Sequence, residues 1–514
     1  MESLNERAPV MNATLTETHR SFSLRAAIVR LSMLAVATAT LGALPVRADE
    51  QSELIQKLLL RIEQLEKKVE SHEGGKTNPV VQPPVSDKPA VQELDQKIRA
   101  LERKSELATE DATAKAREAP RVSVGSGGFA LSSADTNFVL KIRGVIQMDT
   151  RAFFNDNPAL TGNDGFLLRR ARPIIEGTVF RDFDFQFVPD FGGGTAQIFD
   201  AWLNYRYQPE VQLKLGKFKS PIGLEQLQAD VNLNFNERSL ATDLVPNRDL
   251  GVQIWGDISG GLVSYAAGVF NGIGDARNSS NADFDDKKAV EGRLFFQPFK
   301  KFDLPALQGF GFGLGGSYSQ VGANATGLPN GGGFVTDGQQ QFFAYTNGVV
   351  ANGEHWRLSP QASYYYGPFG LLGEYAISNQ RVSRGRFADR LQNTAWQISG
   401  QWILTGEDTS FNGVNPLHPF DPRAGQWGAW QVVGRYAKLD VDNDAFPLFA
   451  NPSASASSAA AWSVGLNWWL NRNVRILTSF SHTTFDGGGK GPVAPGAVTH
   501  QPENVFFTRV QLSF

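Results

Sequence analysis

The sequence predicts a transmembrane antiparallel β-barrel of about sixteen strands, preceded by a short α-helical coiled-coil segment. Apolar and polar residues alternate along long segments between residues 138 and 514. Past residue 48 no segment approaches the roughly 20 apolar residues of a membrane-spanning helix, so a chain embedded in a membrane must cross it as a closed barrel. Short turns alternate with long connections that are rich in glycine and asparagine, which is the pattern of such barrels.

The composition favours strands and turns over helices. The 514 residues include 36 Phe, 10 Trp and 52 Gly, and the hydrophobic fraction of 41% is too low for a helical membrane protein. The net charge of −3 gives no indication of nucleic-acid binding. The absence of cysteine excludes disulfides, zinc–thiolate sites and thiol catalysis. We therefore expect no metal, no cofactor and no nucleic-acid partner.

Residues 1–48 have the features of an export signal peptide. Three arginines between positions 20 and 30 precede an apolar run, residues 31–43, and a small residue stands at Ala48. Cleavage after Ala48 would release this segment. An uncleaved anchor is the alternative, and the shortness of the apolar run disfavours it.

Residues 50–72 carry a heptad pattern, with apolar residues at alternating spacings of three and four and with Glu and Lys between them. One helix cannot bury such a seam alone, which favours a self-associating stalk over a single amphipathic helix resting on another part of the protein. A proline-containing linker with a weaker second helical segment follows at residues 73–120. We expect the barrel to occupy residues 138–514. The seam residues are Ile55, Leu58, Ile62, Leu65 and Val69.

The predicted strands present one apolar and one polar face. A soluble β-sandwich shows the same alternation, but strands of about ten residues or more suit a tilted bilayer crossing, because soluble strands average about half that length. In one such strand Phe199 and Leu203 are expected on the apolar face and Asp200 on the polar face. Aromatic residues at strand ends are expected to form girdles at both membrane boundaries. These are Phe183, Phe185, Tyr205, Tyr207, Tyr364, Tyr366, Trp402, Trp468 and Phe514.

Segments 166–192, 213–227, 402–408 and 427–441 resemble the phosphate-selective porin O and P family of Gram-negative outer membranes, and the closing FFTRVQLSF is similar to the C-terminal signal that outer-membrane barrels present for insertion. The resemblance covers roughly residues 138–514. It implies a homotrimer of sixteen-stranded barrels in outer-membrane lipid, and the heptad segment is then expected in the periplasm. It also implies that the third long loop (residues 220–248) folds inward and that the turn at 405–425 is enlarged. The implied function is a passive, water-filled channel for small inorganic anions such as phosphate.

The resemblance also places residues at the constriction. In phosphate-specific members, paired arginines of the second strand and an aspartate of the fourth strand line it. Adjacent Arg169 and Arg170 cannot both face the lumen of a regular strand, so a bulge or a loop boundary is needed there. The alternative is that most lumen charges are solvated wall charges paired across strands. The candidate pore residues are Arg169, Arg170, Arg172, Asp200, Lys217 and Lys219.

The sequence departs from the family at other positions of its phosphate site. Gln226 and Asp184 replace two lysines, and Ala229-Asp230 replaces a serine pair. If the third loop enters the pore, its acidic groups would face the arginines of the wall and weaken the preference for anions. The alternative function is therefore a non-specific or weakly selective general porin, with a coiled-coil stalk that tethers the outer membrane to the cell wall.

An enzymatic barrel is the remaining possibility, and the sequence disfavours it. Hydrolysis of an ester or peptide needs a nucleophile beside a base such as histidine. The chain has six histidines, and none lies in a setting like that of a catalytic nucleophile. We therefore expect a channel without catalytic residues.

Overall fold

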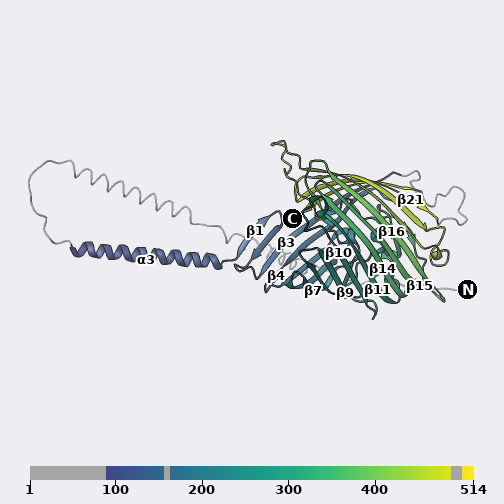
Figure 1. Ribbon diagram of the computed structural model, residues 1–514, viewed down its shortest axis with the longest axis horizontal. Coiled ribbons are helices and arrows are strands. Elements are labelled where there is room, and N and C mark those ends of the chain that lie inside the picture. The colour runs from purple at the N-terminus through teal and green to yellow at the C-terminus, as the bar shows by residue number, and fades with distance from the viewer. Residues whose placement is uncertain (1–87, 155–161, 488–500) are drawn as a thin grey trace, which may run out of the picture. The chain divides into compact units, whose positions relative to one another are not determined.

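Eighteen of the described strands form one antiparallel sheet that closes on itself (Figure 1), and the other four form two short hairpins. The computed structural model describes residues 88–154, 162–487 and 501–514. The ring closes where β22 (Glu503–Ser513) pairs with β3 (Val139–Phe153). Of the 18 strands in this sheet, β1 (Arg121–Gly125) and β2 (Gly128–Ser132) stand outside the ring, and the other sixteen described strands form it. The predicted barrel and its strand number are confirmed.

The ring strands follow each other around the barrel in chain order. They are β3, β4 (Gly165–Val179), β5 (Phe183–Asp190), β6 (Gln197–Gln208), β7 (Val211–Lys219), β8 (Arg248–Ile258), β9 (Val263–Phe270), β10 (Ala289–Phe296), β11 (Phe310–Asn324), β14 (Val349–Tyr366), β15 (Phe369–Arg384), β16 (Phe387–Ile403), β19 (Ala429–Asp440), β20 (Ser458–Trp469), β21 (Val474–Asp486) and β22.

The two ends of the barrel differ in their connections. At the end where β3 begins, links such as 209–210 and 367–368 are short, and we call this the turn end. The opposite end, here the loop end, carries most of the long links, including residues 220–247. The long link 404–428 is an exception at the turn end, as expected. It folds back so that Gln228 Nε2 donates to the carbonyl oxygen of Phe411 at 2.9 Å.

Large apolar side chains cover the outside of the barrel. On β22, Phe506 and Val510 are 41% and 50% exposed, whereas the alternate residues Phe507 and Arg509 are 2% and 0% exposed. The same alternation recurs on β19 and β20. A soluble sandwich would bury its apolar face against a second sheet, so this outward apolar surface is that of a barrel in lipid.

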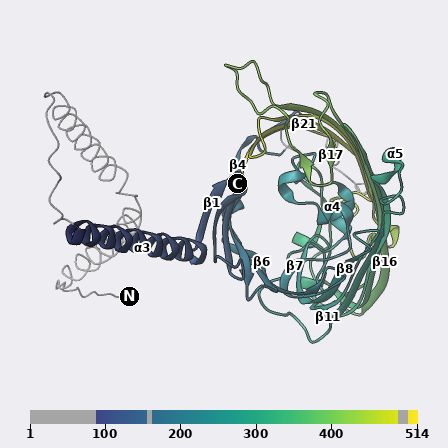
Figure 2. The ribbon, with the colours of Figure 1, turned by 60° about the vertical axis from the view of Figure 1, so that its left-hand side comes forward.

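The inside of the barrel is partly filled by packed loops. The third loop, here residues 220–247, lies within the ring of strands with α4 (Leu224–Leu227) and η4 (Leu240–Leu244) (Figure 2). Leu240 packs in one apolar cluster with Phe334 and Phe343 of the link 325–348 and with inward residues of β14 to β20. This apolar filling leaves the open space along β3 to β9, where the cavities described below lie.

The aromatic residues that the sequence assigned to two girdles all lie at one end of the barrel. Phe183 and Tyr205 have ring centroids 5.0 Å apart, and Trp430 stacks on Trp468 at the same distance. All nine residues assigned to girdles from the sequence lie at the turn end. The assignment of this set to two girdles was wrong, because successive strands run in opposite directions, and all nine residues stand where their strands begin or end at the turn end.

The barrel sheet starts earlier than predicted, and the second helical segment is longer. The β1–β2 hairpin pairs with the first residues of β3, from Phe129 opposite Ile142 to Ser132 opposite Val139. Before it, α3 (Lys88–Glu118) runs for 31 residues with i,i+4 ion pairs between Glu and Lys and between Asp and Arg. Among the described residues, no helix combines the length and the apolar character that a membrane crossing requires. The predicted signal peptide and coiled coil, residues 1–48 and 50–72, lie outside the described residues.

Candidate functional site

A β-bulge at Arg169 turns two adjacent arginines into the lumen. Gln147 of β3 faces Arg170, and Met148 faces Leu168, which leaves Arg169 without a partner on β3. Arg170 Nη1 donates to Gln147 Oε1 at 2.6 Å, and Arg169 Nε contacts Glu237 at 2.7 Å. Of the two possibilities that the sequence left open, a bulge or a loop boundary, the structure has the bulge, whose extra residue shifts the face of the strand.

The third loop is held inside the barrel by its backbone. Glu374 of β15 accepts a hydrogen bond from the Leu224 N–H at 2.6 Å, at the start of α4. Arg475 of β21 donates to the Leu233 carbonyl at 2.8 Å, and Asn467 of β20 donates to the Asn234 carbonyl at 2.9 Å. These contacts come from three different strands of the wall, so the loop is fixed at several points around the ring. The predicted inward folding of this loop is confirmed.

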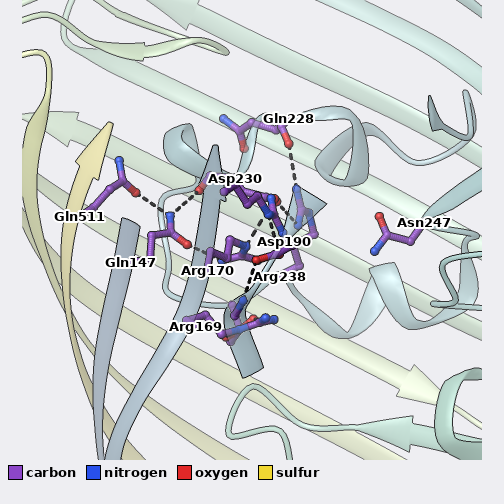
Figure 3. Close-up of polar contacts among 12 residues, drawn as sticks. Gln147, Arg169, Arg170, Asp190, Gln228, Asp230, Arg238, Asn247 and Gln511 are labelled. Atoms are coloured by element: carbon purple, nitrogen blue, oxygen red, sulfur yellow. Dashed lines mark hydrogen bonds and ion pairs between the residues drawn. The ribbon is translucent and has the colours of Figure 1, made fainter. Parts of the chain in front are cut away.

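Asp230 of the third loop joins three arginines (Figure 3). It pairs with Arg172, lies 3.4 Å from Arg170 Nε and lies 2.6 Å from Arg238 Nη1. Burial by itself would raise the pKa of the Asp230 carboxyl, but the arginines outweigh this effect and hold its pKa well below its ordinary value. Asp230 is therefore ionised and neutralises part of the positive charge at the centre of the pore.

Glu237 also neutralises arginines of the wall, nearer the loop end. Besides Arg169, it pairs with Arg151 at 3.3 Å and with Arg509 at 3.5 Å. Burial would raise the pKa of Glu237, whereas Arg169 and its neighbours lower it to a net value below the usual range. Its side chain is 5% exposed. Arg509, with 1% of its side chain exposed, is therefore not a solvated wall charge, because the inward loop covers it, whereas 28% of the Arg169 side chain is exposed.

Phe199 lies between two guanidinium groups. The Cζ atoms of Arg172 and Arg248 lie 3.7 and 3.6 Å from its ring centroid. Arg172 also pairs with Asp190 at 2.6 Å, and Arg248 pairs with Asp200 at 3.0 Å. The expected lipid-facing position of Phe199 was wrong, because a bulge in β6 at this residue turns the ring inward.

The two candidate lysines are held by backbone carbonyl groups. Lys217 Nζ donates to the Ser279 carbonyl at 2.5 Å, and Lys219 Nζ donates to the Gln228 carbonyl at 2.7 Å. Lys219 still lines a cavity, whereas Lys217 lines neither of the two lumen cavities. The structure thus brings five of the six candidate residues to the lumen cavities and places Lys217 behind them.

Two chambers meet at Arg172, which lines both. The chamber toward the loop end has a volume of about 420 Å³ and is lined by Arg151, Arg169 and Arg170. The chamber toward the turn end has a volume of about 580 Å³ and contains Asp200. Arg170 and Arg172, with Asp230 and Arg238, form the partition between the two chambers.

Cations outnumber carboxylates in the lining of both chambers. Six Lys and Arg residues face three Asp in the turn-end chamber, an excess of three. Five Arg face three Asp and Glu in the loop-end chamber, an excess of two. One of these three acidic residues is Asp243. Burial and nearby Asp337 and Asp275 raise the pKa of its carboxyl well above the usual value, and the hydrogen bond from the Val335 N–H offsets part of this shift. Both chambers therefore have a lining with a net excess of positive side chains.

Lys214 is a lumen residue that the candidate set lacks. It stands between the outward residues Leu213 and Leu215 of β7, so the alternation along this strand was enough to predict that Lys214 faces the lumen. Arg248 and Arg293 also line the turn-end chamber. Arg248 was harder to place, because the sequence gives no sign of where the third loop ends and β8 begins.

The barrel is similar to known porins, and the family can be assigned. The sequence profile of the family described as phosphate-selective porin O and P matches residues 140–493. The outer membrane channel DcaP of Acinetobacter baumannii has a TM-score of 0.50 at 11% identity, over 76% of this chain and all of that chain. Salmonella typhi OmpF in complex with daunomycin has a TM-score of 0.45 at 11% identity, over 77% of this chain and 100% of that chain. No curated protein sequence matches the chain. The chain belongs to the phosphate-selective porin O and P family, and it is a channel-forming outer-membrane porin.

Proposed function

We propose that this porin is a passive channel with a weak preference for small anions. The observation that carries the proposal is the excess of cations in the lining of both lumen chambers. Rings of Arg and Lys lower the free energy of an anion in a narrow pore and raise that of a cation. A hydrated solute passing Arg172 encounters this excess on both sides of the partition.

The acids of the third loop make the preference weak. Asp230 and Glu237 are buried against the arginines of the wall and offset part of their charge. The guanidinium groups that remain are shared between loop carboxylates and passing solutes. This arrangement supports a general anion-preferring pore more than one tight anion site.

A phosphate-specific channel is the second candidate function, and family membership favours it. Three positions argue against it. Asp230 stands where the family has a serine and neutralises arginines. Gln226, at a lysine position, hydrogen-bonds with Asn247, and Asp184, at another, pairs with Arg206 at 2.9 Å.

Planar bilayer recordings test both candidates. In a KCl gradient, the proposed pore gives a zero-current potential with the sign of chloride permeation. Phosphate added to chloride reduces the current only at concentrations similar to those of chloride. A potential with the sign of potassium permeation contradicts the proposal. Block by phosphate at concentrations far below that of chloride supports the phosphate-specific candidate instead.

We also propose that the porin assembles as a homotrimer through the part of the barrel wall that has the shortest strands. β5, β9 and β10 have 8 residues each, whereas β14 has 18. Eight residues rise about 26 Å along the strand and about 20 Å along the barrel axis at a 40° tilt, less than the roughly 25 Å apolar band of such barrels. Contact with neighbouring subunits would cover this wall, and light scattering of the protein in detergent measures the subunit number.

We propose that the N-terminal helical region is a periplasmic stalk. Ile98 and Leu101 of α3 are 48% and 66% exposed in the single chain, and pairing with the same helix of another copy would cover them. Deletion of residues 50–72 distinguishes a stalk that only anchors or clamps the barrel from one that also affects conduction. Conductance should be unchanged if the stalk only clamps the trimer or tethers the barrel to the cell wall, and altered conductance would contradict a purely anchoring role.

A further inference from the structure

Aromatic rings and cations line the turn-end chamber together. Trp202, Trp255 and Tyr265 line its wall on β6, β8 and β9, and Lys214 lies on β7 between the two tryptophans. We infer that this chamber binds organic anions with a flat apolar body, such as aromatic carboxylates, more strongly than small inorganic anions. This inference rests on the proposed anion channel and names the class of solute that the channel retains longest.

The rings are held in place by their polar edges. Trp202 Nε1 donates to Gln186 Oε1 at 3.2 Å, and Trp255 Nε1 donates to Asn204 Oδ1 at 2.8 Å. Tyr265 donates its hydroxyl hydrogen to the Glu210 carbonyl at 2.8 Å. Because these bonds use the polar edges, a solute meets ring carbon. Fixed rings also lose little conformational entropy when a second ring packs against them.

Lys214 offers its charge to a solute. Its Nζ lies 4.4 Å from the Trp202 ring centroid and 5.3 Å from that of Trp255, and it makes no hydrogen bond or ion pair with any residue in the described part of the chain. Asp200, a carboxylate of the same chamber, is already paired with Arg248. Burial against rings leaves the ammonium partly desolvated, so an arriving carboxylate gains more than it would at a fully hydrated lysine.

Arg293 is a second cation of this chamber that lacks a carboxylate partner among the described residues. Its Nε donates to Gln361 Oε1 at 2.8 Å, and its Cζ lies 4.6 Å from the Phe295 ring centroid. Lys214 and Arg293 therefore supply charge, while the rings supply apolar surface.

The rest of the lining distinguishes organic from inorganic anions. Val145, Ile174, Val188 and Leu227 also line this chamber. A chloride or phosphate ion gains nothing from such a surface, whereas an aromatic carboxylate removes its ring from water there. The loop-end chamber has Phe199 as its single aromatic lining residue, and two guanidinium groups already cover that ring. The preference therefore belongs to the turn-end chamber.

The test compares three probes of related shape in single-channel recordings of the full-length protein. Benzoate has a ring and a charge, acetate has the charge alone, and benzamide has the ring alone. We expect benzoate to reduce the chloride current by half at a concentration about tenfold below that of acetate, from the usual strength of ring contacts. Benzamide should have no comparable effect.

Variants assign the effect to this chamber. Trp202→Leu and Trp255→Leu should each raise the half-blocking concentration of benzoate toward that of acetate and leave acetate unchanged. Trp462→Leu is the matched control, because Trp462 is 43% exposed on the outer face of β20. Lys214→Met removes no hydrogen bond or ion pair with the described residues, so it should fold even if a tryptophan variant does not. It should weaken block by benzoate and leave benzamide unchanged.

Two kinds of failure can be told apart. Suppose that the zero-current potential has the sign of chloride permeation. If benzoate and acetate then block equally, or if benzoate blocks the tryptophan and Lys214 variants as strongly as the unmodified protein, the inference is overturned and the anion channel stands. If the zero-current potential has the sign of potassium, the anion channel is overturned, and this inference falls with it.

Discussion

Arg169 and Arg170 are neighbours in the chain, yet both enter the lumen, because Arg169 is the unpaired residue of a bulge opposite Gln147 and Met148. Arg169 reaches Glu237 toward the loop end, and Arg170 reaches Gln147 at the partition. One extra residue thus lets a single strand supply cations to two levels of the pore. The bulge is local backbone geometry with a direct effect on the charge of the channel.

Arg169→Gln should reduce the preference for anions. Its side chain is 28% exposed, so it meets solvent as well as Glu237, and its loss leaves one positive charge fewer in the loop-end chamber. The zero-current potential in a KCl gradient should move toward zero. Lys438→Gln is the matched control, because Lys438 lies on the outer face of β19 and pairs with Asp440 there. An equal change in both variants would contradict a lumen role for Arg169.

Glu237→Gln should have two effects that are measured separately. Removing this carboxylate frees Arg169, Arg151 and Arg509, so the preference for anions should increase. Leaving buried cations without their partner costs about 3–5 kcal/mol, so the barrel should also unfold at a lower temperature. Bilayer recordings and thermal melting in detergent check the two effects. A shift of the zero-current potential toward potassium would contradict the assignment of Glu237 as a neutralising acid.

Phe199→Leu should destabilise the partition. The ring is 6% exposed and lies between Arg172 and Arg248, and each buried cation–π contact contributes about 1–2 kcal/mol. Phe506→Leu on the outer face of β22 is the control, with a ring that is 41% exposed. Melting temperatures should be lower for Phe199→Leu than for the control. Equal values would show that the two guanidinium groups gain nothing from the ring.

Asp275→Asn should weaken the barrel in a pH-dependent way. Burial alone would raise the pKa of Asp275, but Arg357 at 2.5 Å and His355 at 3.5 Å outweigh it and lower the pKa to about 2. Since the ordinary value is about 3.9, the ion pair stabilises the fold by about 2–3 kcal/mol above pH 4, and this stability is lost as the pH falls from about 4 to about 2.

Tryptophan fluorescence during urea unfolding in detergent measures this effect. The difference in free energy of unfolding between Asp275→Asn and the unmodified protein should be large at pH 7 and should shrink toward pH 2. Lys217→Met is a comparison at a cation that bonds to a loop carbonyl. Its effect on the free energy of unfolding should not change between pH 4 and pH 2 in the way expected for Asp275→Asn. A difference for Asp275→Asn that stays constant with pH would contradict the lowered pKa.

The sequence was sufficient for the barrel because lipid imposes a simple rule on each strand. Alternating residues face hydrocarbon and lumen, so Leu203 was placed correctly on the outside and Asp200 in the lumen without any knowledge of neighbours. Phe199 was misplaced because a bulge breaks the alternation, and no local pattern marks a bulge. The bulge at Arg169 was predicted only because two adjacent arginines required it.

The candidate site was harder to predict than the barrel, because its contacts join distant parts of the chain. Glu237 meets Arg509 across 272 positions, and strand periodicity carries no information about such a pair. Lys217 and Lys219 have the right charge but bond to loop carbonyl groups. The path of the third loop decides which cations face solvent, and this path depends on packing inside the closed barrel.

The double variant Lys214→Met with Arg293→Met tests most directly whether the chamber lining sets selectivity. It changes the excess of cations in the turn-end chamber from three to one, without removing a carboxylate ion pair among the described residues. The account predicts that the zero-current potential of this variant in a KCl gradient moves from the chloride side toward zero. An unchanged potential, in a variant that inserts and conducts normally, would contradict the claim that these lumen cations determine which ions pass.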